Sequence, residues 1–238
     1  MSKMRLDKFL SNAKICTRSE CVNLVKKHLI TVNDILVNKK DILIDVDNDV
    51  VKVKGEIVKK VNFIYLMLNK PGGYVSSTND PRDKTVLDLL SEDYRKFKLF
   101  PCGRLDKDTV GLIILTNDGK ATHALLSPKH HVKKVYYFEL ADEITEEKAK
   151  SLEKGVKLAD GYITKPCEVK MEGKTSGYIT LTEGKYHEIK RMFATLSNKV
   201  IYLKRISFSS IILDENLKEG EYRKLTDVEE SVFKNIIK

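Results

Sequence analysis

The first sixty residues carry two patterns of apolar and polar positions, one helical and one extended. Apolar side chains near the N-terminus recur at the spacing of one helix face: Leu6, Phe9, Leu10 and Ala13. The run Thr17–Glu20 has the form of a capping box, which predicts the start of a second helix. Short apolar runs at 30–37 and 50–53 predict a hairpin and one further strand. We therefore expect a compact unit of two basic helices on a small sheet, residues 1–60, with a polar linker at 54–62.

Beyond residue 61 the apolar runs are longer and alternate with helical stretches. Continuous or alternating apolar runs predict strands at 63–69, 112–115, 134–140, 167–171, 177–182, 200–203 and 206–212. Capping signals or helical spacing predict helices at 85–90, after the turn 117–119 through Leu126, at 145–154, around 189–196 and at 227–237. Strands with helices between and beside them predict a mixed sheet of the α+β class. Residues 61–238 therefore form a second, larger domain.

Charge adds a partner to this picture. The 43 Lys and Arg exceed the 34 Asp and Glu, which gives a net charge of +9. Seven basic residues lie within 1–30, and six lie within 185–205 beside a single acid, Glu188. Two separate basic blocks favour nucleic acid as the partner over a merely solvated Lys-rich face. No apolar run approaches the roughly 20 residues of a membrane span, and the N-terminus has no signal core, so we expect a cytoplasmic protein without membrane contact.

Several classes of chemistry lack their signatures. The sequence contains neither a Walker loop nor G-x-G-x-x-G, so the phosphate cradles of nucleotide hydrolysis and dinucleotide binding are missing. It contains no G-x-S-x-G motif. The four cysteines form no C-x-x-C pair and are expected to be reduced. His130 and His131 have no Cys or carboxylate at ligand spacing, so we expect no metal site.

Three polar motifs remain near the ends of predicted strands. The first, Gly103–Asp106, precedes the strand at 112–115, and its carboxylate is either a turn former or a nucleophile or base. In the second, Lys134 and Tyr136 share one face of a strand, either for cross-strand packing or for chemistry. The third, Glu183–Met192, places cations at the border of a helix, either for phosphate contact or to keep a buried carboxylate ionised.

In this order the three motifs resemble those of the pseudouridine synthases of the RsuA type. The segment Arg5–Leu10 with its second basic helix resembles the S4 RNA-binding domain that this family carries in front. Further similar segments, at 68–75, 127–131 and 220–226, extend the resemblance over nearly the whole chain. Leu196-Ser197-Asn198 departs from it, because the family usually has Gly before Asn. The resemblance implies a small α/β S4 domain, followed by a catalytic domain whose mixed, mainly antiparallel sheet is flanked by helices.

The resemblance also implies an activity: conversion of a uridine in ribosomal RNA to its C-glycoside isomer, without metal or organic cofactor. Asp106 would be the catalytic carboxylate, with its route left open, and Lys190 its counter-ion. Tyr136 would pack on the uracil and relay the C5 proton, and Leu203 would form part of the apolar wall of the pocket. Arg104 would fill the gap that the flipped nucleotide leaves. Further RNA contacts are implied for Arg191, Arg5, Lys8, Arg18, Lys26 and Lys27.

The pair Tyr186-His187 indicates the RNA substrate, because it is similar to the small-subunit (16S) enzymes, whereas large-subunit relatives more often have Asn-Arg. We therefore expect the protein to act on 16S rRNA or on a small-subunit assembly intermediate. Because the sequence shows no heptad seam or spare apolar helix face, we expect a monomer. A 23S rRNA synthase of the same family is one alternative. A non-catalytic rRNA-binding or ribosome-assembly factor is another, and the intact set of Asp106, Tyr136 and Lys190 argues against it.

Overall fold

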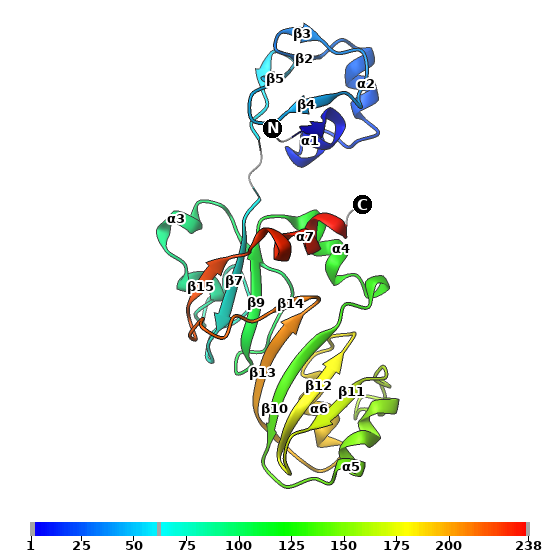
Figure 1. Cartoon of the computed structure of the whole chain (residues 1–238), viewed down its shortest axis with the longest axis vertical. Helices are drawn as coiled ribbons and strands as arrows, with labels where there is room; N and C mark the ends of the chain where they lie inside the picture. Colours follow the sequence, from blue (N-terminus) through cyan, green and yellow to red (C-terminus); the bar gives the residue numbers. More distant parts are fainter. Residues whose placement is uncertain (1–2, 61–62, 237–238) are drawn as a thin grey trace. The chain divides into compact units, whose positions relative to one another are not determined.

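The computed structural model describes residues 3–60 and 63–236, and the chain divides into two compact units, Met1–Asn62 and Phe63–Lys238 (Figure 1). Each unit has a hydrophobic core of its own. The two units are therefore described separately.

The N-terminal unit packs two helices, α1 (Leu6–Asn12) and α2 (Cys21–Lys26), on short strands. Its strands are β1 (Lys3–Arg5), β2 (Ile30–Val32), β3 (Ile35–Leu36), β4 (Leu43–Asp45), β5 (Val51–Val53) and β6 (Glu56–Ile57). They form a four-stranded sheet in the order β3-β2-β5-β6 and a separate β1-β4 pair. The apolar stripe of α1 is buried here, with Leu6 and Leu10 fully covered.

Two details of this unit differ from the sequence prediction. The capping bonds are present, since the Thr17 amide donates to the Glu20 carboxylate and the Glu20 amide to the Thr17 hydroxyl, but the helix proper begins at Cys21. The predicted linker at 54–62 is wrong in its first half, where β6 pairs with β5 around a turn at Lys54 and Gly55. Both turn residues have positive φ. Strand β6 has only two residues and lies in a polar segment, so the sequence pattern does not reveal it.

The C-terminal unit is built on a nine-stranded sheet in the order β11-β12-β10-β13-β9-β7-β15, with β8 and β14 added at β9 and β13. Only the β9–β13 pair is parallel among the ladders of the described residues, which confirms the mixed, mainly antiparallel sheet. The strands are β7 (Tyr65–Lys70), β8 (Phe100–Pro101), β9 (Val110–Thr116), β10 (Lys134–Leu140), β11 (Glu168–Met171), β12 (Ser176–Leu181), β13 (Val200–Phe208), β14 (Ile211–Ile212) and β15 (Tyr222–Lys224).

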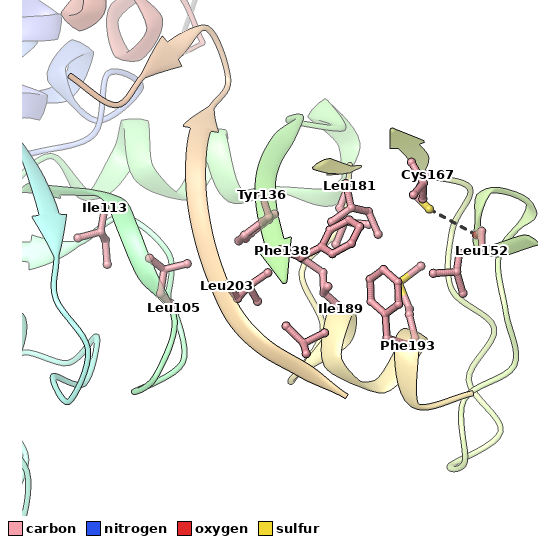
Figure 2. Packing of buried hydrophobic residues seen from close by; sticks show 14 of the residues in the cluster. Leu105, Ile113, Tyr136, Phe138, Leu152, Cys167, Leu181, Ile189, Phe193 and Leu203 are labelled. Atoms are coloured by element: carbon pink, nitrogen blue, oxygen red, sulfur yellow. Dashed lines mark hydrogen bonds between the residues drawn. The ribbon is translucent and has the colours of Figure 1, made fainter. Parts of the chain in front are cut away.

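Helices cover both faces of this sheet, because successive residues of β7 and β9 enter two different clusters. One cluster includes Phe138 packed on Phe193 of α6, with ring centroids 4.7 Å apart (Figure 2). The other includes Tyr65 packed on Phe233 of α7, at 4.6 Å. The helices are η1 (Val86–Leu89), α3 (Glu92–Arg95), α4 (Gly119–Leu126), η2 (Pro128–His130), α5 (Glu146–Lys150), η3 (Ser151–Lys154), α6 (Glu188–Ala194) and α7 (Asp227–Asn235).

Strand β13 corrects one boundary. The sequence predicted a break between 203 and 206, where two basic residues interrupt the apolar run, but the strand is continuous. Arg205 is 2% exposed, and its Nε donates to the Leu112 carbonyl at 2.7 Å. A buried cation that is hydrogen-bonded to the neighbouring strand thus replaces the expected loop. As a result Leu203 and Arg205 both lie beside β10, opposite Phe138 and Tyr136.

Candidate active site

Asp106 lies in the loop between β8 and β9, and short polar contacts hold that loop. The Ser76 hydroxyl donates to the Leu105 carbonyl at 2.9 Å, and the Leu105 amide donates back to it at 3.0 Å. Gly111, at the start of β9, has φ +97°, and an added Cβ would lie 2.4 Å from the Arg205 carbonyl oxygen. The loop therefore ends where β9 approaches β13 too closely for a side chain.

The buried side chain of Lys70 holds the same loop in place. It is fully buried, and its Nζ donates to the carbonyl oxygens of Pro71, Lys107 and Thr109 at 3.0, 3.1 and 2.8 Å. Burial lowers the pKa of Lys70 to about 8. No role for this lysine was predicted from the sequence, although a lysine at the end of an apolar strand, directly before Pro71, was a usable signal.

The carboxylate of Asp106 faces the ammonium group of Lys190, on α6, and the imidazole ring of His187, the residue before that helix. Lys190 Nζ lies 3.2 Å from Asp106 Oδ2 and 2.5 Å from Asp108 Oδ1, and His187 Nε2 lies 3.6 Å from Asp106 Oδ1. Partial burial raises the pKa of the Asp108 carboxyl, but the hydrogen bond and the charge of Lys190, with smaller contributions, together outweigh burial and lower that pKa. Lys190 is thus shared between two acids.

An apolar wall adjoins these charges. The pocket around Asp106 is lined by Leu105, Tyr136, Ile189 and Leu203, and Figure 2 shows the strands and helix that supply them. Tyr136 is 8% exposed and Leu203 6%. Charge–charge interactions are strengthened where such walls exclude water. The arrangement can therefore hold a flat, neutral ring against the carboxyl group of Asp106.

Glu188, which belongs to the motif Glu183–Met192 but was given no role of its own from the sequence, also lines this pocket. It is 4% exposed, and its Oε2 accepts a hydrogen bond from the Lys185 amide at 2.7 Å. Its Oε1 has no hydrogen-bond partner among the described residues. Burial, assisted by the neighbouring Glu183, raises the pKa of Glu188 above its usual range. A carboxyl that holds its proton can donate to a carbonyl oxygen of a bound ring.

Five of the residues named from the sequence line one pocket: Arg104, Asp106, Tyr136, Lys190 and Leu203. Arg191 is directed elsewhere, since its Nη2 lies 2.5 Å from Asp160 Oδ2 and its Nη1 donates to the Tyr186 carbonyl. The cations assigned to RNA in the N-terminal unit lie on α1, on α2 or beside them. Arg5 is paired with Asp7 at 2.8 Å, Lys8 is half-buried, and three are exposed: Arg18, Lys26 and Lys27.

Within residues 3–60 and 63–236, no group of three or more His, Cys, Asp or Glu could hold a metal ion. In the same ranges no helix is long and apolar enough to cross a membrane.

Comparison with known proteins identifies both units. A family model described as RNA pseudouridylate synthase matches residues 64–195, and one described as S4 domain matches residues 4–51. These matches define the class: an RNA-binding S4 domain joined to a pseudouridine synthase domain. The chain belongs to the RNA pseudouridylate synthase family, and its predicted resemblance to the RsuA-type enzymes is confirmed.

Its relatives match along almost their whole lengths. An uncharacterized RNA pseudouridine synthase of Bacillus subtilis is 45% identical over 230 residues, which cover 95% of this chain and 96% of the relative. Ribosomal small subunit pseudouridine synthase A of Vibrio cholerae is 40% identical over 227 residues, with 95% and 97% covered. A crystal structure of a pseudouridylate synthase has a TM-score of 0.70 at 36% identity and covers 97% of this chain and 99% of that one.

Proposed function

We propose that this enzyme isomerises a uridine of 16S rRNA to pseudouridine, with Asp106 as its catalytic carboxylate. The N1–C1′ bond breaks, the uracil turns, C5 bonds to C1′, the C5 proton is released, and N1 takes up a proton. The observation that carries the proposal is the placement of Asp106 beside Lys190 and against the apolar side chains of Tyr136 and Leu203. An acid needed as nucleophile or base must stay ionised when the substrate displaces water, and the adjacent ammonium group favours that state.

The other residues have supporting roles in this proposal. Tyr136 packs on the uracil and relays the C5 proton, while Arg104, exposed at the pocket rim, fills the space of the extracted nucleotide. The S4 domain, residues 1–60, adds affinity through its exposed cations, and the catalytic domain comprises residues 61–238. The choice of 16S rRNA is supported by relatives named for the ribosomal small subunit and by Tyr186-His187, whose rings stack 3.8 Å apart. The proposed enzyme works as a cytoplasmic monomer without a cofactor.

Tritium release tests the reaction directly. Transcripts of 16S rRNA and 23S rRNA labelled with tritium at C5 of uridine are incubated with the wild type and with Asp106→Asn. We expect release from 16S rRNA by the wild type, and a loss of at least about 10³-fold in the variant with RNA affinity within a few fold. Release from 23S rRNA alone would move the substrate to the large subunit. No release from either RNA, or from partly assembled small subunits, would favour a binding factor.

A further inference from the structure

A second cavity adjoins the pocket of Asp106. It has a volume of about 540 Å³, and it shares Arg104, Tyr136, Gly184 and Lys185 with that pocket. Five cations line it, against one carboxylate, Glu183: Arg104, Lys134, Lys165, Lys185 and Arg205. The Glu183 carboxylate already accepts hydrogen bonds from the Tyr162 hydroxyl at 2.6 Å and the Lys165 amide at 2.7 Å. The cavity therefore carries a strong excess of positive charge.

Arg205 is the most buried of these cations. Its Nε is used by the Leu112 carbonyl, but its Nη2 is buried and has no hydrogen-bond partner within the part of the chain that the structure describes. Its guanidinium carbon lies 5.2 Å from the centre of the Phe208 ring. Joining β13 to β9 requires only Nε, so that contact leaves Nη2 unexplained. A buried guanidinium donor without an acceptor is costly unless a ligand supplies one.

Lys134 lies next to Arg205, and its charge likewise has no ion-pair partner among the described residues. Its Nζ donates to the Val132 carbonyl at 2.7 Å and lies 5.9 Å from the centre of the same Phe208 ring. The strand register sets Tyr136 opposite Arg205 and Lys134 opposite Phe208. Burial, and then the charge of Arg205, lower the pKa of Lys134 to about 8. No carboxylate among the described residues forms an ion pair with either cation, so an anion entering the cavity would stabilise both.

We propose that this cavity binds a phosphodiester group of the RNA, that of a nucleotide adjoining the flipped uridine. The inference rests on the proposed function, because it requires the uridine in the pocket of Asp106. The shared residues make the two sites contiguous, as neighbouring nucleotides on one strand require. A guanidinium group matches the geometry of phosphate oxygens, and a volume of this size accommodates a nucleotide. Phe208, Tyr162 and Leu125 line the same cavity and give the sugar or base an apolar surface.

The site itself is tested without RNA. The probe is inorganic phosphate, added to the full chain while the Nε–H signal of Arg205 is followed by NMR. Lys134→Gln removes the second cation, and Lys133→Gln is the matched control, because Lys133 is exposed and paired with Glu168 at 2.9 Å. We expect a saturable shift in the wild type and in Lys133→Gln, with affinity about tenfold weaker in Lys134→Gln. No shift, or equal affinity in all three proteins, would overturn the anion site.

The RNA assignment is tested by phosphate ethylation interference. End-labelled fragments around the modified uridine are ethylated at random phosphates and selected for binding to each protein. We expect ethylation of one phosphate adjoining that uridine to block binding to the wild type and to Lys133→Gln, but to lose this effect in Lys134→Gln. An identical pattern in all three proteins would overturn the assignment and leave free phosphate as the ligand.

Two checks keep these results separate from other failures. Arg205→Lys keeps the positive charge but removes the planar pair of donors. If this variant melts within a few degrees of the wild type, we expect it to lose phosphate affinity. Unchanged affinity would contradict the role of Nη2. Absence of tritium release from every rRNA would refute the proposed function, while the phosphate titration would still decide whether the cavity binds anions.

Discussion

The two cavities that share Tyr136 differ in how their charges are balanced. Around Asp106 the acids have a cation within the protein, since Lys190 contacts both Asp106 and Asp108. Around Lys134 and Arg205 the cations meet carbonyl groups and an aromatic ring, but no ion-pair partner among the described residues. The first arrangement places an ammonium group beside two carboxylates and so favours their charged form. The second favours a ligand that carries negative charge.

The largest effect should come from breaking the ion pair between Lys190 and Asp106. Lys190→Met leaves Asp106 without its nearest cation, so we expect kcat to fall about 10²-fold or more. Lys190→Arg, which keeps the charge, should retain most of the rate. Tritium release at saturating RNA measures both variants. If Lys190→Met kept the wild-type rate, the ion pair would have no part in the reaction.

Substitution of Lys70 tests whether the loop that carries Asp106 must be held rigidly. Lys70→Met removes three hydrogen bonds at similar side-chain volume, and we expect a loss of about 2–3 kcal/mol in the free energy of unfolding, with a lower kcat. Chemical denaturation measures the stability. Lys107→Met, whose lysine is half-exposed and paired with Asp83, is the control and should change stability by less than about 1 kcal/mol.

The same variant gives a pH test whose sign follows from linkage. The pKa of Lys70 is about 8 in the folded protein, below the usual value for lysine, so the unfolded chain binds more protons from about pH 8 to 10.5. The contribution of this residue to stability should therefore rise with pH across that window and stay constant below it. Wild type and Lys70→Met should accordingly diverge between pH 8 and 10; parallel curves would exclude a lowered pKa.

A smaller effect is expected at the second cavity, around Lys134 and Arg205. Because the pKa of Lys134 is about 8, the affinity of the second cavity for sulfate, an anion of constant charge, should weaken several-fold between pH 7 and 9. Arg205 stays charged in this range, and burial raises the pKa of the facing Cys102 to about 11. The facing carboxylates Glu183 and Glu188 are the remaining groups near Lys134. Lys134→Arg should remove most of the pH dependence, as measured by titration calorimetry; the same dependence in that variant would assign it to another group.

The smallest effect belongs to surface cations of the S4 domain. Lys26 is exposed on α2, so Lys26→Gln should weaken RNA binding only two- to threefold near 0.15 M salt and reduce the salt slope of log K by about one. Filter binding at four salt concentrations measures this. A change in kcat at saturating RNA would show that Lys26 does more than contact phosphates.

The sequence predicted the long elements well because their patterns are regular. Strand β10 begins and ends as predicted, at Lys134 and Leu140, and α6 carries the expected stripe of Ile189, Met192 and Phe193. Two-residue strands such as β6 and β8 have no period to detect. The predicted break in β13 lies where Lys204 and Arg205 interrupt the apolar run, and only the packing of β9 reveals the carbonyl partner of Arg205.

The candidate site depended more on family resemblance than on local pattern. Asp106 and Lys190 are far apart in the sequence, and no periodicity places one beside the other. Arg191 looked equivalent to Lys190, but it lies on another side of α6 and meets Asp160. The burial of Glu188 was also hidden, because a glutamate next to lysines in sequence is normally solvated.

The parallel pairing of β9 with β13 spans two residue pairs, Val110 with Lys204 and Gly111 with Arg205. One end of this short seam continues the Asp106 loop, and the other carries the guanidinium group of the second cavity. Gly111 allows the two backbones to meet there, and a methyl group in its place would wedge them apart. The seam therefore joins the strand that carries Arg205 directly to the loop that carries Asp106, so a change of packing at Gly111 would reach both sites.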